Sequence, residues 1–218
     1  MELWSHLDRS AKSDPVVAEL GRALFPAPLV AALTEAGGIL PVHLLIVPGP
    51  YLWNLPWSGL VVADDHRLVS LARVSLTPSL TGLATRSPSG RTAVNAWIPP
   101  AGPGFVKGAD LLRLDLPEIM VIGACWSSRV DSVSEPYALP LIAHARGAHD
   151  IIGGIYPLPD SHPFPTARLL TQLYPALLGT DPATALWLAQ HEAAMADAAP
   201  HTWAGVIHTT VTLTGDHS

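Results

Sequence analysis

Short runs of apolar residues, each closed by a turn signal, recur along the chain. The first is residues 43–47 (HLLIV), which Pro48-Gly49-Pro50 ends. A run of this length without polar alternation is typical of a strand that is buried on both faces of a sheet. Similar runs predict five further strands, at residues 73–77, 93–98, 119–124, 150–156 and 206–213.

Stretches with helical periodicity lie between several of these strands. Asp14-Pro15 and Asp181-Pro182 are start signals, because an aspartate accepts hydrogen bonds from free N–H groups and a proline has no N–H to satisfy. Gly37-Gly38 is a stop signal, where we expect the left-handed conformation that ends many helices. The predicted helices are residues 15–25, 28–36, 109–114, 137–146, 166–178 and 182–198.

The alternation of strands and helices predicts the fold class. Apolar strands that alternate with helices indicate an α/β domain built around a mostly parallel sheet. Residues 85–108 are rich in Pro, Gly and Ser and predict the longest loop. Because the chain shows neither an internal repeat nor a linker, we expect a single domain over residues 1–218.

Composition and charge narrow the class of protein. With 49% hydrophobic and 14% charged residues, the 218-residue chain can bury a large core. Its formal charge is −6 and it has no basic cluster, which argues against nucleic acid as a partner. No apolar run reaches the roughly 20 residues that span a bilayer, and the N-terminus lacks a secretory pattern. Together with the single cysteine, these features predict a cytoplasmic protein without a membrane partner, and the preference for Arg over Lys suggests a bacterial source.

The single cysteine, Cys125, ends the segment MVIGAC, and other segments surround it in a recognisable order. LIVPGPYLWNLPWSGL (residues 45–60) and TPSL (77–80) precede it, and Glu135-Pro136 follows. The later segments are LIAHARGAHDIIGGIYPLPD (141–160), Ala185-Leu186 with Ala189-Gln190, and Trp203-Ala204-Gly205. In this order the segments resemble the CHAT domain, a caspase-like peptidase module of bacteria that is often attached to tetratricopeptide repeats. The resemblance extends over about residues 15–213.

The resemblance implies a caspase-like α/β sheet and a cysteine peptidase whose nucleophile is Cys125. In that family the general base is a histidine in a His-Gly step after an earlier strand. This chain has no histidine between His66 and His144. The interval from Leu80 to Cys125 is also short for the family, which implies that one strand–helix unit is lacking. A second alignment places Asn95 at the position of the base and does not restore it.

The absence of that histidine matters for the chemistry of the thiol. A thiol with an ordinary pKa of about 8.5 is only a few per cent ionised at neutral pH. A neighbouring imidazolium lowers that pKa and later protonates the leaving amine, so both roles are vacant without it. His149 or His162 would approach Cys125 if a loop folded over the sheet edge, and Asp160 would then orient the imidazole.

Each of these residues also has an ordinary structural interpretation. A lone cysteine is often a small buried apolar residue, and we expect the seven tryptophans to serve packing. No His-x-x-x-His or Cys-x-x-Cys pair occurs, so we expect no metal or other cofactor. We expect exposed or capping side chains at His43, His144, His149 and His162, and surface groups at His201, His208 and His217.

Three carboxylates lie after the cysteine and suggest a recognition pocket. Asp131 and Glu135 follow Cys125 closely, and Asp160 stands at the end of the next predicted strand. In bacterial caspase-like peptidases, acidic groups at such places select a basic side chain, so the resemblance implies a substrate-binding role for these three. The alternative interpretation is that they are solvated loop carboxylates.

Three functions fit these observations. The leading hypothesis is a CHAT-like pseudopeptidase that keeps Cys125, lacks the family histidine and binds a protein or peptide partner. The second hypothesis is an active cysteine endopeptidase whose base is an unaligned histidine. The third is an incomplete copy of a larger CHAT protein, in which apolar surface would be left uncovered.

Overall fold

The computed structural model describes residues 15–49, 52–63, 66–80, 84–85, 94–97, 116–123, 127–128, 139–157 and 165–213. The helices are α1 (Pro15–Leu24), α2 (Ala27–Ala36), α4 (Leu139–Ala145), α5 (Pro165–Leu177) and α6 (Pro182–Met195), with single 3-10 turns η2 (Trp57–Gly59), η3 (Leu68–Ser70) and η4 (Pro200–Thr202). The strands are β1 (Val42–Ile46), β2 (Val61–Ala63), β3 (His66–Arg67), β4 (Ala72–Leu76), β5 (Ala84–Thr85), β6 (Val94–Trp97), β7 (Ile119–Ile122), β8 (Asp150–Gly154), β9 (Val206–Thr210) and β10 (Thr212–Leu213).

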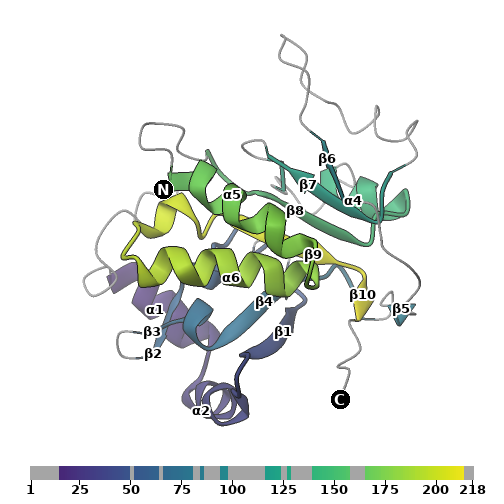
Figure 1. Cartoon of the computed structure of the whole chain (residues 1–218). Helices are drawn as coiled ribbons and strands as arrows, with labels where there is room; N and C mark the ends of the chain where they lie inside the picture. The colour runs from purple at the N-terminus through teal and green to yellow at the C-terminus, as the bar shows by residue number, and fades with distance from the viewer. Residues whose placement is uncertain are drawn as a thin grey trace.

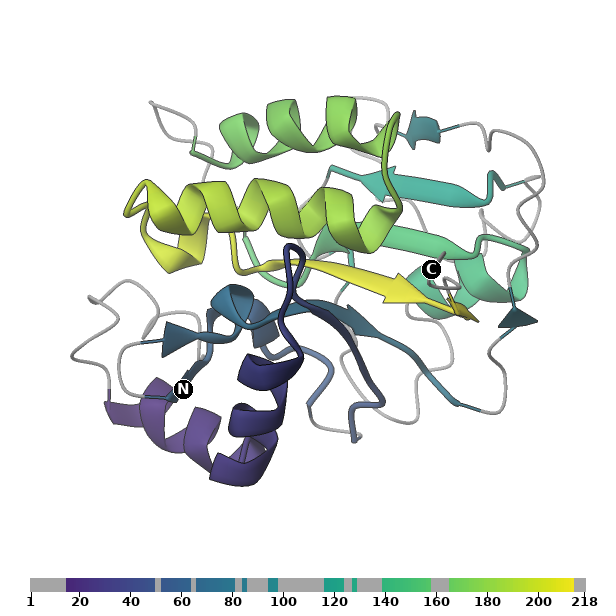
Figure 2. The same cartoon turned by 60° about the horizontal axis from the view of Figure 1, so that its bottom comes forward.

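A six-stranded sheet in the order β1-β4-β9-β8-β7-β6 forms the centre of the described structure (Figure 1). β6, β7 and β8 are parallel to one another, and so are β1, β4 and β9. The two halves meet where β8 and β9 pair in antiparallel fashion, and in Figure 2 β9 (yellow) points the opposite way from β7 (teal). The sheet therefore has strand carboxyl ends at both of its edges.

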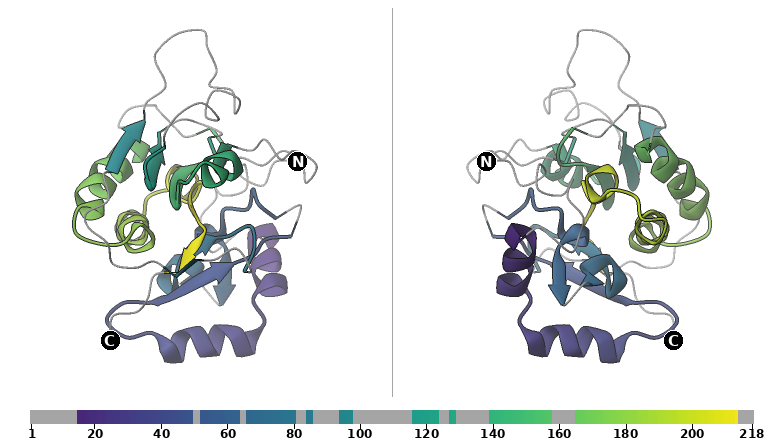
Figure 3. Two further views of the ribbon diagram at one scale, coloured as in Figure 1. Left: turned by 90° about the vertical axis from the view of Figure 1, so that its right-hand side faces the viewer. Right: turned by 90° about the vertical axis from the view of Figure 1, so that its left-hand side faces the viewer.

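Helices cover both faces of this sheet (Figure 3). α5 and α6 pack on the face formed by Val121, Ile152 and Val206. On the opposite face, α4 packs on Met120 and Ile151, while α1 and α2 cover the half of the sheet that contains β1 and β4. The predicted fold class, an α/β domain with a mostly parallel sheet between helices, is confirmed.

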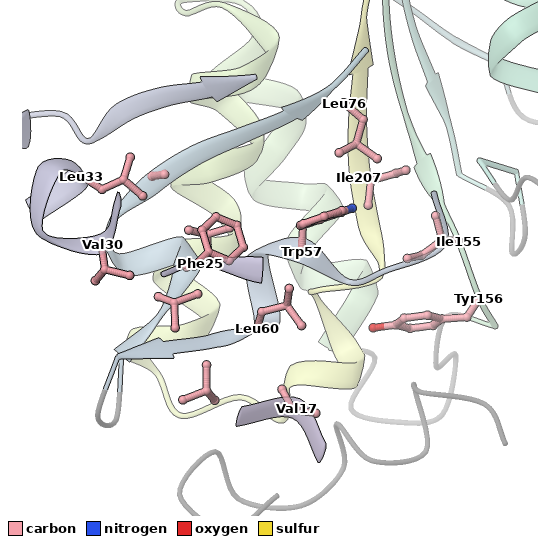
Figure 4. Close-up of a cluster of buried hydrophobic side chains, with 14 residues drawn as sticks. Val17, Phe25, Val30, Leu33, Trp57, Leu60, Leu76, Ile155, Tyr156 and Ile207 are labelled. Carbon is pink, nitrogen blue, oxygen red and sulfur yellow. The ribbon is translucent and has the colours of Figure 1, made fainter. Parts of the chain in front are cut away.

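The largest cluster of buried apolar side chains lies under α1 and α2 (Figure 4). Phe25 and Trp57 meet edge to face with ring centroids 6.2 Å apart. Leu76 of β4 and Ile207 of β9 extend the cluster across the sheet, which joins the N-terminal helices to β9. Among the described helices none is long and apolar enough to cross a bilayer alone, and α1 with α2 passes that test only as a pair bent by 81°.

Local signals placed most elements within a few residues. α6 begins at Pro182 as predicted, and its N-cap Asp181 accepts a hydrogen bond from the Thr184 N–H at 3.0 Å. α2 ends before Gly37 as predicted, but the expected left-handed conformation is wrong, since Gly37 is extended with φ −68° and ψ 119°. A left-handed glycine does occur after α4, at Gly147 with φ +96°.

The remaining sequence predictions concern the strands, one helix and the number of domains. The six predicted strands correspond to β1, β4, β6, β7, β8 and β9, although residues 206–213 divide into β9 and the short β10. β2, β3 and β5 were missed because two- and three-residue strands carry too short a pattern. The predicted helix 109–114 lies outside the described residues. The single domain and the lacking strand–helix unit stay predictions.

Candidate functional site

The predicted site residues lie in segments that the structure leaves out. Cys125, Asp131, Glu135 and Asp160 are all outside the described residues, and so is His162. The flanks of the cysteine are described, however, because β7 ends at Ile122 and Ser127 and Ser128 follow Cys125 closely. The described parts of the candidate site are therefore these flanks and the polar side chains of the sheet.

The serines after the cysteine are held against the end of β8. The Ser127 hydroxyl donates to the carbonyl of Ile122 at 3.0 Å and accepts from the N–H of Gly154 at 2.9 Å. The Ser128 N–H donates to the carbonyl of Gly154 at 2.8 Å. Both serines are buried. Ser127 and Ser128 thus anchor the chain that follows Cys125 at the carboxyl ends of β7 and β8.

Close packing at Gly153 makes this anchor possible. A Cβ atom built on Gly153 would overlap the hydroxyl oxygens of both Ser127 and Ser128. The Ser128 hydroxyl is buried and has no hydrogen-bond partner in the described structure. The position next to the two serines therefore requires glycine, whose lack of a side chain lets them approach the strand.

A chain of hydrogen bonds crosses four strands on the face that α6 covers. His43 Nε2 lies 2.7 Å from Ser75 Oγ, and Ser75 Oγ lies 2.6 Å from His208 Nδ1. His208 Nε2 in turn lies 3.0 Å from Asp150 Oδ1. These residues stand on β1, β4, β9 and β8, so the four side chains join both halves of the sheet. We call them the sheet relay.

The direction of the relay follows from the charge of Asp150. An ionised carboxylate only accepts, so His208 donates from Nε2 and its Nδ1 becomes an acceptor. Ser75 then donates to His208 Nδ1 and accepts from His43 Nε2. Ser75, His208 and Asp150 are 0%, 2% and 1% exposed, so the relay satisfies polar groups that would otherwise be costly to bury.

Ser75, His208 and Asp150 have the order of a hydroxyl nucleophile, a base and an orienting acid. In a hydrolase that order activates the hydroxyl toward a substrate. Here the Ser75 hydroxyl is fully buried and accepts a hydrogen bond from His43. For β4 and β9 the register holds one pair within the described residues, Leu76 with Thr209, so the Ser75–His208 bond reinforces a sparsely paired seam.

The first turn of α6 covers the relay with further polar groups. Arg73 donates from Nη1 to Thr184 Oγ1 at 2.6 Å and from Nε to the carbonyl of Pro41 at 2.9 Å. Burial alone would raise the pKa of Asp181, but hydrogen bonds from Thr184 and the charge of Arg73 outweigh it and hold that pKa below its usual range. Burial and the charge of Arg73 lower the pKa of His43 from 6.5 to about 4.

These contacts correct the expectations for several histidines. His208 was expected at the surface and is buried in β9, because Ser75 and Asp150 occupy both of its ring nitrogens. His43 is hydrogen-bonded within the sheet and is not exposed. His144 does act near a helix end as expected: Nδ1 bonds the carbonyl of Ala148 at 2.7 Å and Nε2 bonds Thr209 Oγ1 at 3.1 Å. Burial lowers the pKa of His144.

Two other histidines differ in the edge of the sheet at which they lie. His149 precedes β8, at the edge where β7 and β8 begin, so the structure separates it from the end of β8 by the length of that strand. His201 stands in η4, just before β9, and the start of β9 pairs with the end of β8. His201 thus lies at the edge of the sheet toward which β7 runs, and the register places His43, near the start of β1, at the same edge. No group of three potential metal ligands occurs within the described residues.

The sequence did contain a signal for the sheet relay. Each member stands in or beside an apolar strand: His43 in VHLLI, Ser75 in ARVSL, His208 in VIHTT and Asp150 in DIIGG. A polar side chain in a strand buried on both faces needs a buried partner. Those partners could have been sought among the other strands, although their pairing depends on the strand order.

The fold and the flanks of Cys125 define an α/β protein whose single cysteine follows a central parallel strand. The family model of the CHAT domain matches residues 91–211, more than half of the chain. The chain therefore belongs to the CHAT domain family, a family of caspase-like peptidases. The resemblance expected from the sequence is confirmed over residues 91–211. No curated protein matches the chain.

Proposed function

We propose that this chain is a CHAT-family pseudopeptidase that keeps the nucleophile position at Cys125, lacks a catalytic histidine and binds a protein or peptide partner. The observation that carries the proposal is the engagement of the histidines around the cysteine strand. His144 and His208 have both ring nitrogens in hydrogen bonds, and the Nε2 of His43 bonds Ser75. None of these three offers an unengaged Nε2 to a thiol.

Distance within the sheet supports the same proposal. A general base must come within about 3 Å of the proton that it removes, or reach it through one water. Asp150 and Gly154 are the first and last residues of β8, and at 3.3 Å per residue they are about 13 Å apart. His149, which precedes Asp150, therefore lies at least that far from the carboxyl end of β8. His43 stands on β1, which two strands separate from β8. Across the sheet this places β1 about 14 Å from β8.

The proposed partner carries a basic side chain. Asp131, Glu135 and Asp160 would supply the acidic groups that this side chain meets, in the role that such carboxylates have in the caspase-like family. A pocket of this kind binds without cleaving when the thiol has no base, because positioning does not require proton transfer. The chain would then act by docking a segment that an active relative would cut.

An activity-based probe tests this function. The folded protein is incubated at neutral pH with a peptide that carries a basic side chain and a thiol-reactive group. We expect labelling no faster than that of the urea-denatured chain, and we expect Cys125→Ala to abolish what labelling remains. Labelling of the folded chain that is a hundredfold faster than that of the denatured chain would contradict the proposal.

Asp160→Asn, with Asp197→Asn as a control, tests the acidic pocket by binding of an unreactive basic peptide.

A second candidate function is an active cysteine endopeptidase, and the place of His201 favours it. His201 lies in η4 at the edge of the sheet toward which β7 runs. For this function, His201→Ala should remove Cys125-dependent labelling, whereas His191→Ala on α6 should leave it unchanged. Equal labelling of both variants and the parent chain would exclude His201 as the base.

A further inference from the structure

An open apolar groove lies between the two N-terminal helices and β2. Its volume is about 560 Å³, and eight of the nine described residues that line it are apolar. Four of the nine are alanines, at positions 18, 27, 31 and 63, and these small side chains leave the space unfilled. Phe25 and Val30 close its inner side, where they belong to the main core (Figure 4).

Arg22 is the single charged residue among the described residues that line this groove. It is exposed at the end of α1, and within the described structure its guanidinium forms neither an ion pair nor a side-chain hydrogen bond. The chain as a whole carries a formal charge of −6, so a cation next to an apolar groove stands out from the general surface. An apolar groove with a free cation at its border favours an apolar partner that carries a carboxylate.

The second helix of the groove is covered less than its sequence would predict. α2 is apolar except for Thr34 and Glu35, yet only Val30 and Leu33 are buried. A helix that is apolar on nearly all sides is normally buried. Ala27 and Ala31, which line the groove, remain exposed, so a partner placed there would complete the burial of this side of α2.

The openness of the groove indicates what kind of partner fits. Small-molecule sites are concave and enclose most of their ligand. Here Arg22, Ala27 and Ala31 are exposed, so the groove would leave a small ligand largely in water. An amphipathic helix brings its own backbone as a cover and inserts large side chains spaced at i, i+3, i+4 and i+7.

We propose that this groove docks an amphipathic α-helix of another protein, with large apolar side chains over Ala18, Ala27 and Ala31 and an acidic side chain opposite Arg22. We call it the α1–α2 groove. The inference goes beyond the proposed function, because it does not involve Cys125 or the carboxylates that follow it. It holds whether or not the cysteine is reactive.

Matched helical peptides test the proposal with the full chain. A panel of fluorescent peptides of about four turns carries Leu or Phe at the inward positions, each made with either Glu or Lys beside the apolar face. Fluorescence anisotropy measures their affinity. We expect at least one Glu peptide to bind, and its Lys counterpart to bind about three- to fivefold more weakly, as for an exposed ion pair.

Two variants identify the place of binding. Arg22→Glu should reverse the preference between the Glu and Lys peptides, because it changes only the charge at the border of the groove. Ala31→Phe should weaken both peptides about tenfold or more, because the ring would occupy the groove. Leu178→Ser, a substitution of an exposed residue after α5, should change neither affinity. Equal unfolding transitions of all three variants would show that the effects are not due to misfolding.

Other outcomes would overturn the inference. A panel without any binder, or affinities that Ala31→Phe leaves unchanged, would show that the groove is not a helix-docking site. Binding of laurate without binding of any peptide would assign the groove to a small alkyl carboxylate instead. Because the assay does not depend on Cys125, a negative result here leaves the labelling experiment on the proposed function unaffected.

Discussion

Removal of the Ser75 hydroxyl tests the sheet relay at its centre. Ser75 donates to His208 at 2.6 Å and accepts from His43 at 2.7 Å, so Ser75→Ala breaks two hydrogen bonds with the loss of one oxygen. His208 Nδ1 would remain buried without a donor, because the only other bond of that ring is the one from Nε2 to Asp150. The seam between β4 and β9 would lose the side-chain contact that reinforces it.

The expected loss can be estimated from these partners. A buried acceptor left without its hydrogen bond costs about 1–3 kcal/mol, which applies in full to His208. His43 is only partly buried and can turn to water, so its share is at the lower end, about 1 kcal/mol. We therefore expect Ser75→Ala to lower the free energy of unfolding by about 2–4 kcal/mol, or the melting temperature by roughly 4–16 °C.

Urea unfolding at pH 7.5 measures this loss, and Ser58→Ala is the matched control. Ser58 is also buried, but its hydroxyl forms no hydrogen bond in the described structure, so its removal should cost less than about 0.5 kcal/mol. In a His43→Leu background, Ser75→Ala should cost about 1 kcal/mol less, because one of its two partners is already absent. Equal effects of Ser75→Ala and Ser58→Ala would refute the relay as a source of stability.

Three further predictions concern neighbouring parts of the molecule. Folding lowers the pKa of His43 from 6.5 to about 4, so the folded state favours the neutral ring. The stability that this neutral ring supports is complete above pH 6.5. It falls by at most about 3 kcal/mol as the pH drops to 4. His43→Gln should flatten urea-derived stability over that range, and an unchanged pH curve would assign the loss to other groups. Gly153→Ala should destabilise the fold by about 1–3 kcal/mol and alter the alkylation rate of Cys125, whereas Gly179→Ala, with open space around it, should do neither. Asp181→Ala should lower the free energy of unfolding, measured by thermal unfolding, by about 1–2 kcal/mol through loss of the α6 cap. Asp181→Asn should keep at least half of the stabilisation that the cap provides. Equal losses in the Ala and Asn variants would show that the charge of Asp181, not its capping hydrogen bond, stabilises α6.

The parts of the fold that the sequence predicted well are those with strong local patterns. The Asp181-Pro182 start of α6 depends on contacts within four residues, and the run in β1 is apolar except for His43. The antiparallel pairing of β8 with β9 was not predicted, because both strands are buried on both faces and such runs carry no sign of direction. Strand order is set by contacts between distant segments.

The site was harder to predict for the same reason. Ser75 and His208 are 133 residues apart in the chain, and His208 and Asp150 are 58 apart. His208 in VIHTT was expected at the surface, because a lone histidine in the sequence does not indicate its partners. Its burial depends on a serine and an aspartate that only the strand order brings beside it.

The direction of the strands bears on the proposal that Cys125 has no histidine as its base. Ligand sites of α/β sheets form at strand carboxyl ends, and this sheet has such ends at both edges because its two halves are antiparallel. β7 runs toward one edge, whereas β1 and β4, which hold His43 and Ser75, lie in the other half of the sheet and run the opposite way. The relay engages His208 from both sides, so the histidine of β9 cannot turn toward the edge of the cysteine without breaking its hydrogen bonds to Ser75 and Asp150. A base for Cys125 would have to come from a segment outside these strands, and within the described residues His201 in η4 is one histidine at the edge toward which β7 runs.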